Sequence, residues 1–238
     1  METGAITLLD VMGWKGIWQR NKNAQQALRE LQENTRAVAD LVTQGTVDVF
    51  EVFKGLNVRL QGISGTLAIY TYSDEPERAI AYHCSVAAST IVYAITKGLP
   101  LRGAISYGEF SVEVEEGSTM MVGPAIDEVA AWYEVGDWIG AILTPTGYFR
   151  FQNVAFPGLR PLVPYRVPVK NAAPFLSLCV DWVGTYNYKF TKEALLRHFL
   201  EMQAVVTPDI AGKFMNTIEF YDHVSGFVDN SHEGVSGL

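Results

Sequence analysis

The stretch ITLLDVMGWKGIW, residues 6–18, sets the interpretation of the whole chain. Its apolar start predicts a buried strand that ends at one acid, Asp10, and a glycine-bearing turn follows before a long polar helix. A carboxylate at the end of a buried strand, facing the free backbone N–H groups of a turn, suits a phosphate that is bound through a metal ion. The more ordinary alternative is an acid that caps the next helix, because such caps are common.

The composition predicts a folded protein that binds neither nucleic acid nor a membrane. The 238 residues are 48% hydrophobic, enough for one large domain or a domain with an appendage. No uninterrupted apolar run reaches the ~18 residues of a membrane span, and no secretory signal is evident, so we expect a reducing cytoplasm. The net charge of −8, without a Lys/Arg cluster, argues against a nucleic-acid surface, and an anionic substrate would need an accompanying cation.

The two cysteines do not indicate a disulfide framework or a metal site. Cys84 and Cys179 lack metal-site spacing and lie in apolar stretches, so we interpret both as core thiols. His83, beside Cys84, has no partner at ligand spacing and is expected to be a packing residue.

The first half of the chain has the element order strand, helix, hairpin, helix, strand. The elements are a strand that ends at Asp10, a helix over 21–44, alternating runs over 57–63 and 66–72 around Ser64-Gly65, a helix from Pro76 to Gly98, and a strand over 101–107. Residues 46–54 fit a helix or a strand. The order βαββαβ predicts a ferredoxin-like α+β fold, with an antiparallel sheet that carries its helices on one face.

The second half predicts a C-terminal extension of this core. We expect a helix over 125–134, strands over 138–144 and 176–183, a proline-rich irregular connection over 145–174, and helices over 191–203 and 208–224. Residues 1–144 would then form the core. Residues 145–238 would pack on the same domain, with a mobile Gly/Ser-rich tail over 229–238.

The order of motifs over about residues 5–144 resembles the class III nucleotidyl cyclase catalytic domain. The motifs are the strand-end acid and turn Asp10-Val11-Met12-Gly13-Trp14, the hairpin turn Ser64-Gly65, the Arg- and Gly-containing strand LRGAISYGE over 101–109, and the helix start Gly123-Pro124-Ala125-Ile126-Asp127. Within that class the chain looks most like the bacterial pyrimidine cyclases of Pycsar antiphage defence. Those proteins have a similar length, stand alone and have similar helix starts.

The resemblance implies an enzyme that makes cyclic UMP or cyclic CMP and pyrophosphate from UTP or CTP. A separate effector would read this second messenger. Two divalent cations, Mn²⁺ or Mg²⁺, would be held by Asp10, the carbonyl of Val11 and a second Asp at position 65, and they would activate the ribose 3′-hydroxyl. Backbone N–H groups of Gly13, Trp14 and Lys15 would face the β- and γ-phosphates.

The chain departs from the family pattern at position 65, where it has glycine. An engineered inactive form is the explanation we favour, because the flanking residues Ile63-Ser64 and Thr66-Leu67 look intact. A naturally degenerate protein and an error in the assigned register stay open, and Gly65 is also an ordinary hairpin glycine. Without a second carboxylate we expect slow turnover.

The remaining site positions are predicted less directly. Gln61 and Met120 fall where purine cyclases read the base; Met120 cannot accept from an adenine amino group, which favours a pyrimidine, although both could be ordinary strand residues. Asp127 and Ala131 stand where the family has its transition-state Asn and Arg. Arg102 is the substitute candidate, because a guanidinium can clamp phosphate, and its ordinary alternative is a strand-edge salt bridge.

The family forms each active site across a homodimer, and we assign the contact to residues 112–138. Two other functions stay open. One is a nucleotide-binding sensor or scaffold that has lost its chemistry, which Gly65, Asp127 and Ala131 favour. The other is an adenylate or guanylate cyclase.

Overall fold

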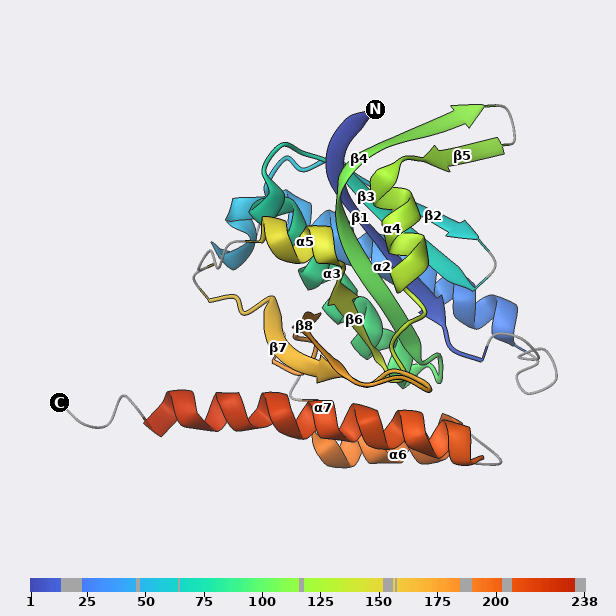
Figure 1. The fold of residues 1–238 in the computed structure, drawn as a ribbon, viewed down its shortest axis with the longest axis vertical. Coiled ribbons are helices and arrows are strands. Elements are labelled where there is room, and N and C mark those ends of the chain that lie inside the picture. Colours follow the sequence, from blue (N-terminus) through green and yellow to red (C-terminus); the bar gives the residue numbers. More distant parts are fainter. Residues whose placement is uncertain are drawn as a thin grey trace.

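The computed structural model describes residues 1–13, 23–45, 48–63, 65–115, 118–151, 156, 158–184, 190–202 and 207–233. These residues form the predicted α+β fold, with one sheet in the order β2-β3-β1-β4-β6-β8-β7 and β5 paired to β4 (Figure 1). The strands are β1 Glu2–Val11, β2 Val58–Ile63, β3 Thr66–Tyr72, β4 Leu101–Glu115, β5 Ser118–Val122, β6 Gly140–Leu143, β7 Leu162–Val167 and β8 Phe175–Val180. The helices are α2 Ala24–Gln44, the 3₁₀-helix η1 Asp48–Phe53, α3 Pro76–Thr96, α4 Pro124–Trp132, α5 Pro145–Arg150, α6 Lys192–Met202 and α7 Pro208–Glu233.

The βαββαβ core is confirmed. β1 lies between β3 and β4 in the order β2-β3-β1-β4, and all three of these strand pairs are antiparallel, whereas β4 and β6 pair in parallel. β1 is longer than the apolar run suggested, because its pairing with β4 begins at Glu2, four residues before Ile6. The ambiguous residues 46–54 contain η1, which buries Phe50 and Phe53.

The two helices of the βαββαβ core, α2 and α3, pack against each other as expected, whereas α4 lies on the opposite face of the sheet. Thr7 of β1 faces α3, since its hydroxyl lies 2.7 Å from His83 Nδ1. Ser106 of β4 pairs with Ile6, the residue before Thr7, and faces α4, donating to Glu128 at 2.6 Å. Successive strand residues point to opposite faces. Both faces of β1 and β4 are apolar and buried here, so helices cover both.

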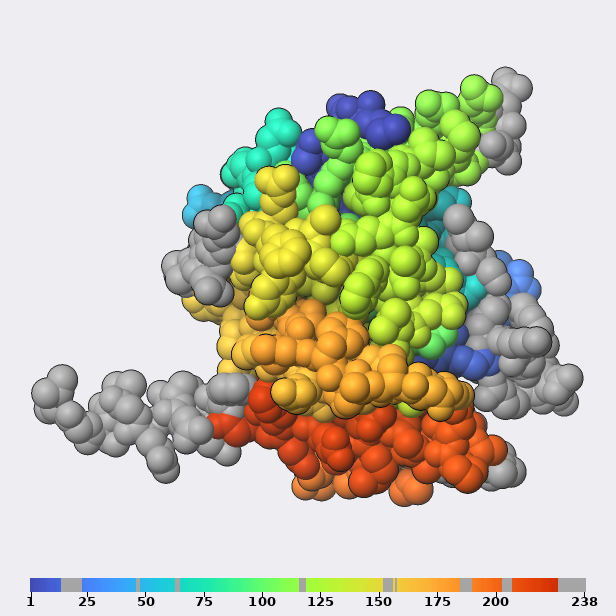
Figure 2. Space-filling model, in the orientation of Figure 1, coloured from blue at the N-terminus to red at the C-terminus, as the bar shows by residue number. Residues whose placement is uncertain are grey.

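The strand expected over 101–107 continues to Glu115, and the sequence analysis missed β5. Beyond Glu109, β4 pairs with β5 to form an arm that projects from the body of the molecule (Figures 1 and 2). Val114 in this arm is 66% exposed. Because the arm packs on little else in this chain, its burial pattern was too weak to predict a strand.

The irregular connection expected over 145–174 is also wrong, because it contains α5 and β7. Its prolines fit these elements: Pro145 is in the first turn of α5, where a missing N–H costs nothing. Pro164 lies in β7, which is the last strand in the sheet order of the described residues and is therefore an edge strand that tolerates proline.

The C-terminal helices are confirmed and join the same body. α7 extends beyond the predicted 208–224 to Glu233, so residues 229–233 of the expected tail are helical, and 234–238 lie outside the described residues. The ring of Phe220 in α7 packs on Trp138, Tyr165 and Trp182, with centroid distances of 4.3, 5.0 and 5.9 Å. α6 and α7 lie side by side at this end of the sheet (Figure 1).

The groups that the sequence assigned to the core are buried. Cys84 and Cys179 are free thiols with no exposed surface, and burial raises the pKa of both. Burial also lowers the pKa of His83 to about 3, so this imidazole is neutral. α3 is long and apolar enough to span a membrane by length and composition, but 83% of its most apolar window is buried, as in the core helix of a globular domain.

Glu128 fixes α4 to the sheet. Its carboxylate accepts hydrogen bonds from the hydroxyls of Ser106 and Thr144 at 2.6 and 2.9 Å, from the Thr146 N–H at 3.0 Å, and from the Thr146 hydroxyl. Burial raises the pKa of Glu128, but these hydrogen bonds outweigh it and hold the pKa below its usual value. The charged carboxylate is therefore the form that the fold stabilises.

We predict that Glu128→Gln destabilises the protein by about 1–2 kcal/mol at pH 7. The NH₂ group of glutamine would face hydroxyl and N–H groups that donate to Glu128. Since the folded pKa lies below the unfolded one, this contribution is complete above the unfolded pKa and is lost as the pH falls through the folded pKa. Urea unfolding at pH 7 and pH 3 measures it, with the exposed Glu113→Gln as control. A Glu128→Gln effect of the same size at both pH values would contradict the assignment.

Candidate functional site

The candidate site lies where β1, β3 and β4 meet, beside Gly65. Asp10 is paired with Thr66 on one side and with Arg102 on the other, and residues directly opposite in antiparallel strands point to the same face. The Thr66 hydroxyl donates to Asp10 Oδ1 at 3.0 Å, and an Arg102 nitrogen lies 3.6 Å from Asp10 Oδ2. The register therefore gathers an acid, a hydroxyl and a guanidinium from three strands.

Arg102 also connects this cluster to the segment after α4. It donates to the backbone carbonyl of Glu134 at 3.0 Å, and its guanidinium lies 3.2 Å from the Glu134 carboxylate. Arg102 thus lies between two carboxylates. It forms the salt bridge that the sequence analysis gave as the alternative to a phosphate-binding role. The sequence analysis missed Glu134, because no sequence pattern shows that a residue after α4 contacts a residue of β4.

The electrostatics of Asp10 are those of a partly buried acid. Burial raises the pKa of Asp10, and the nearby charge of Glu134 raises it further. The hydrogen bond from Thr66 and the charge of Arg102 lower the pKa, but it stays above its usual value. The helix-cap alternative is wrong, because Asp10 lies within β1 and the cap position of α2 is Asn23.

Backbone hydrogen bonds hold the turn after Asp10 on two sides. The Val11 N–H donates to the carbonyl of Gly65 at 3.0 Å, and the Met12 N–H donates to Pro100 at 2.8 Å. Gly13 follows with φ 72°, a left-handed conformation that favours glycine. Trp14 and Lys15, the other two predicted phosphate-binding residues, lie outside the described residues.

The donor set fits one divalent cation better than two. Asp10 supplies a carboxylate and Val11 a carbonyl, which are oxygen ligands that Mg²⁺ and Mn²⁺ prefer. Position 65 is a buried glycine and supplies no side chain. In the part of the chain that the structure describes, no group of three or more His, Cys, Asp or Glu side chains could hold a metal. The carboxylate of Glu134 lies beyond the guanidinium of Arg102.

The two predicted base-reading residues lie on different strand pairs. Gln61 is on β2, opposite Ala68, and Met120 is on β5, opposite Glu113 and 47% exposed. β2 is at one edge of the sheet, and β5 pairs with the end of β4 outside the main strand order. Asp127 and Ala131 are exposed on α4.

Known structures with this architecture are nucleotidyl cyclase domains. The guanylyl cyclase domain of the RhoGC fusion protein from the fungus Blastocladiella emersonii has a TM-score of 0.55 at 12% identity, covering 76% of this chain and 97% of that one. An adenylate cyclase from Trypanosoma brucei has a TM-score of 0.54 at 8% identity, covering 77% and 91%. The adenylyl cyclase CyaB from P. aeruginosa has a TM-score of 0.53 at 7% identity, covering 76% and 94%.

The sequence comparisons add no closer relative. No protein-family model matches the chain, and no curated protein sequence matches it. At the identities of the solved structures, the likeness shows the fold alone, which is the class III nucleotidyl cyclase fold that the motifs predicted.

We predict that each chain binds one Mn²⁺ at this site and that Asp10→Asn weakens this binding at least tenfold, because the amide carries no charge. Titration calorimetry or Mn²⁺ electron paramagnetic resonance with purified protein measures it. Asp48→Asn, which removes an exposed acid from η1, is the matched control and should bind as the parent does. Unchanged binding after Asp10→Asn would move the cation elsewhere.

Proposed function

We propose that this protein is a nucleotidyl cyclase that converts UTP or CTP into cyclic UMP or cyclic CMP and pyrophosphate. The observation that carries the proposal is the position of Asp10, at the end of the central strand, beside the Gly13 turn and opposite Arg102. The shared fold with adenylyl and guanylyl cyclase domains supports it.

The residues of the cluster would divide the work as follows. Asp10 and the Val11 carbonyl would hold a divalent cation, which when bound supplies positive charge to the triphosphate and acidifies the ribose 3′-hydroxyl. Thr66 would orient the Asp10 carboxylate through its hydrogen bond. Arg102 would donate to phosphate oxygens, and the N–H groups of Gly13, Trp14 and Lys15 would face the β- and γ-phosphates.

Because position 65 is glycine, we expect this chain to cyclise nucleotides slowly. A second cation needs a further carboxylate ligand, and the hairpin offers only backbone at this point. The 3′-hydroxyl would then be poorly activated, so turnover would be slow. The hairpin register, with Ile63 opposite Thr66, supports position 65 as the place of the missing acid.

A second candidate function is a nucleotide-binding sensor or scaffold without catalysis. Gly65 favours it, as do Asp127 and Ala131, which lack the amide and guanidinium of the family's transition-state residues. An adenylate or guanylate cyclase is the third candidate, since the solved structures with this fold bear those names. Met120, which cannot accept from an adenine amino group, favours a pyrimidine.

The proposed setting is a cytoplasmic homodimer in antiphage defence, whose product a separate effector reads. This part rests on the resemblance of motifs to the Pycsar cyclases. The arm of β4 and β5 supports the dimer, because it exposes Val114, Met120 and Val122. Met120 and Val122 share one face of this hairpin and Val114 lies on the other, and neighbouring exposed apolar side chains on a projecting hairpin suit a protein contact.

We predict that Gly65→Asp increases cyclisation at least tenfold over the parent chain, because it supplies the carboxylate for a second cation. The assay incubates each form with each of the four nucleoside triphosphates and Mn²⁺, and product identification by mass spectrometry gives the base preference. Gly65→Asn, of equal size without the charge, is the control. Nucleotide binding without product from any form would favour the sensor, and a cyclic purine would favour the third candidate.

We also predict that Met120→Glu combined with Val122→Glu, on one face of the arm, shifts the protein from dimer to monomer, because charges would be buried in the contact. Analytical ultracentrifugation measures the change. Leu200→Glu, at a site on α6 that is 79% exposed, is the control and should leave the dimer intact. An unchanged sedimentation coefficient in the arm variant would remove the arm from the contact.

A further inference from the structure

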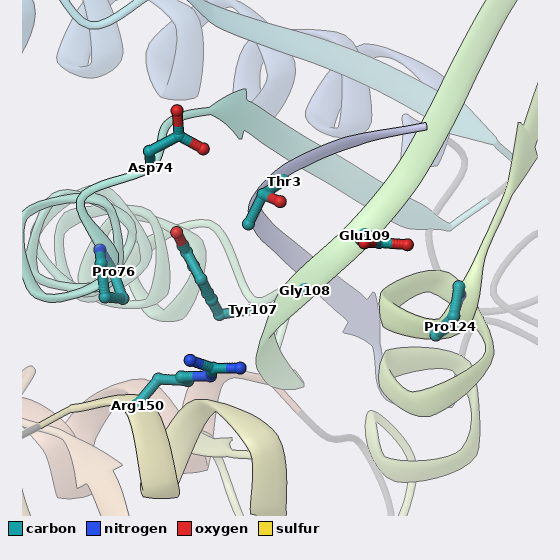
Figure 3. Close-up of a pocket in the computed structure, with 8 residues that line it drawn as sticks. All are labelled: Thr3, Asp74, Pro76, Tyr107, Gly108, Glu109, Pro124 and Arg150. Atoms are coloured by element: carbon teal, nitrogen blue, oxygen red, sulfur yellow. The ribbon is translucent and has the colours of Figure 1, made fainter.

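A second site is indicated by a cavity of about 490 Å³, and its described lining includes none of the predicted site residues (Figure 3). Its walls come from β1, the link between β3 and α3, β4, α4 and α5. The lining residues are Thr3, Asp74, Pro76, Tyr107, Gly108, Glu109, Pro124 and Arg150. The volume falls within the ~300–1,000 Å³ of small-molecule sites.

The cavity is distant from the Asp10 cluster. Thr3 pairs with Glu109 at the cavity, and Asp10 pairs with Arg102 at the cluster, so β1 and β4 connect the two places. Thr3 and Asp10 are seven residues apart, which is about 23 Å along an extended strand. A ligand in the cavity would therefore not occupy the candidate nucleotide site.

The cavity contains one cation whose hydrogen-bonding capacity is unused. The guanidinium of Arg150, at the end of α5, points toward Tyr107 and Gly108 (Figure 3). Arg150 is exposed, and among the described residues it forms no ion pair and no hydrogen bond. The hydroxyl of Tyr107 already donates to the Ser73 carbonyl at 2.8 Å, so Tyr107 serves as a wall. Arg150 is thus placed to donate to an anionic group.

Two carboxylates complement this cation. Asp74 and Glu109 line the cavity, and in the part of the chain that the structure describes neither accepts a hydrogen bond or joins an ion pair. Ligand hydroxyl or amino groups could donate to them. Gly108 leaves room between them, since a Cβ there would only touch that of Ala125 at 3.5 Å.

The charges of the lining limit the ligand. α3 and α4 both begin at this cavity, with Pro76 and Pro124 in their first turns, and neither Glu75 nor Gly123 provides a side-chain cap. Two helix N-termini contribute roughly half a positive charge each, and Arg150 contributes one. The two negative charges of Asp74 and Glu109 offset this positive charge, so the binding of a multiply charged anion is little favoured here.

We propose that this cavity binds a small molecule that carries one negative charge together with hydroxyl or amino groups. Its anionic group would bind Arg150, and its donors would bind Asp74 and Glu109. A cyclic nucleotide, whose phosphodiester has one charge, and a hydroxyl amino acid both have this chemistry. The proposal does not depend on the proposed cyclase activity.

The test is ligand-observed NMR and calorimetry on the full chain with cyclic UMP, L-serine and, as a doubly charged comparison, UMP. We expect cyclic UMP or L-serine to bind more tightly than UMP, and Arg150→Gln to weaken that binding at least tenfold. Arg166→Gln, which removes an exposed arginine from β7, is the matched control and should bind as the parent does. Thermal unfolding confirms that each variant is folded.

Three results would overturn the proposal. They are no binding of cyclic UMP or L-serine at 10 mM, equal binding by Arg150→Gln and the parent chain, and binding that is lost in Asp10→Ala but kept in Arg150→Gln. The last result would place the ligand at the Asp10 cluster instead. Glu109→Gln gives a second measurement, since it should weaken the same probe without changing the Mn²⁺ affinity.

Discussion

The ion pair between Asp10 and Arg102 is the interaction on which this account depends. It joins the two central strands at one level of the sheet, and through Glu134 it connects them to the segment after α4. A partly buried carboxylate is unfavourable without a partner, because burial raises its pKa and disfavours its charge. Thr66 and Arg102 supply the compensation, so the fold keeps an acid where an apolar residue would pack more easily.

The same arrangement sets the limits of the chemistry. A cation at Asp10 would compete with the guanidinium of Arg102, and Arg102 would then be available for a phosphate. Gly65 lies against this cluster through the Val11 N–H, so its missing side chain affects the site directly. The chain therefore combines a fold shared with cyclases and a site with one of the two expected carboxylates. This combination makes slow catalysis and pure nucleotide binding the two functions that experiments need to separate.

Much of the fold was predictable because the core elements carry strong local signals. The stripe of α3, the hairpin around residues 64–65 and the apolar runs of β1 gave the order of elements and the central strand. The arm strand β5 and the edge strand β7 were missed for opposite reasons, since the first buries little and the second contains Pro164. The position of Asp10 at a strand end could be predicted from the sequence. Its partners could not, because Thr66 and Arg102 depend on the register of β3 and β4 with β1, and Glu134 depends on where α4 ends.

The most direct test of the central claim is a crystal structure of the protein with Mn²⁺ and a non-hydrolysable UTP analogue. The account predicts an anomalous manganese peak within coordination distance of an Asp10 carboxylate oxygen, with Arg102 released from Asp10 and directed at the phosphates. A structure in which the nucleotide binds while Asp10 and Arg102 stay paired, and the manganese lies elsewhere, would contradict it.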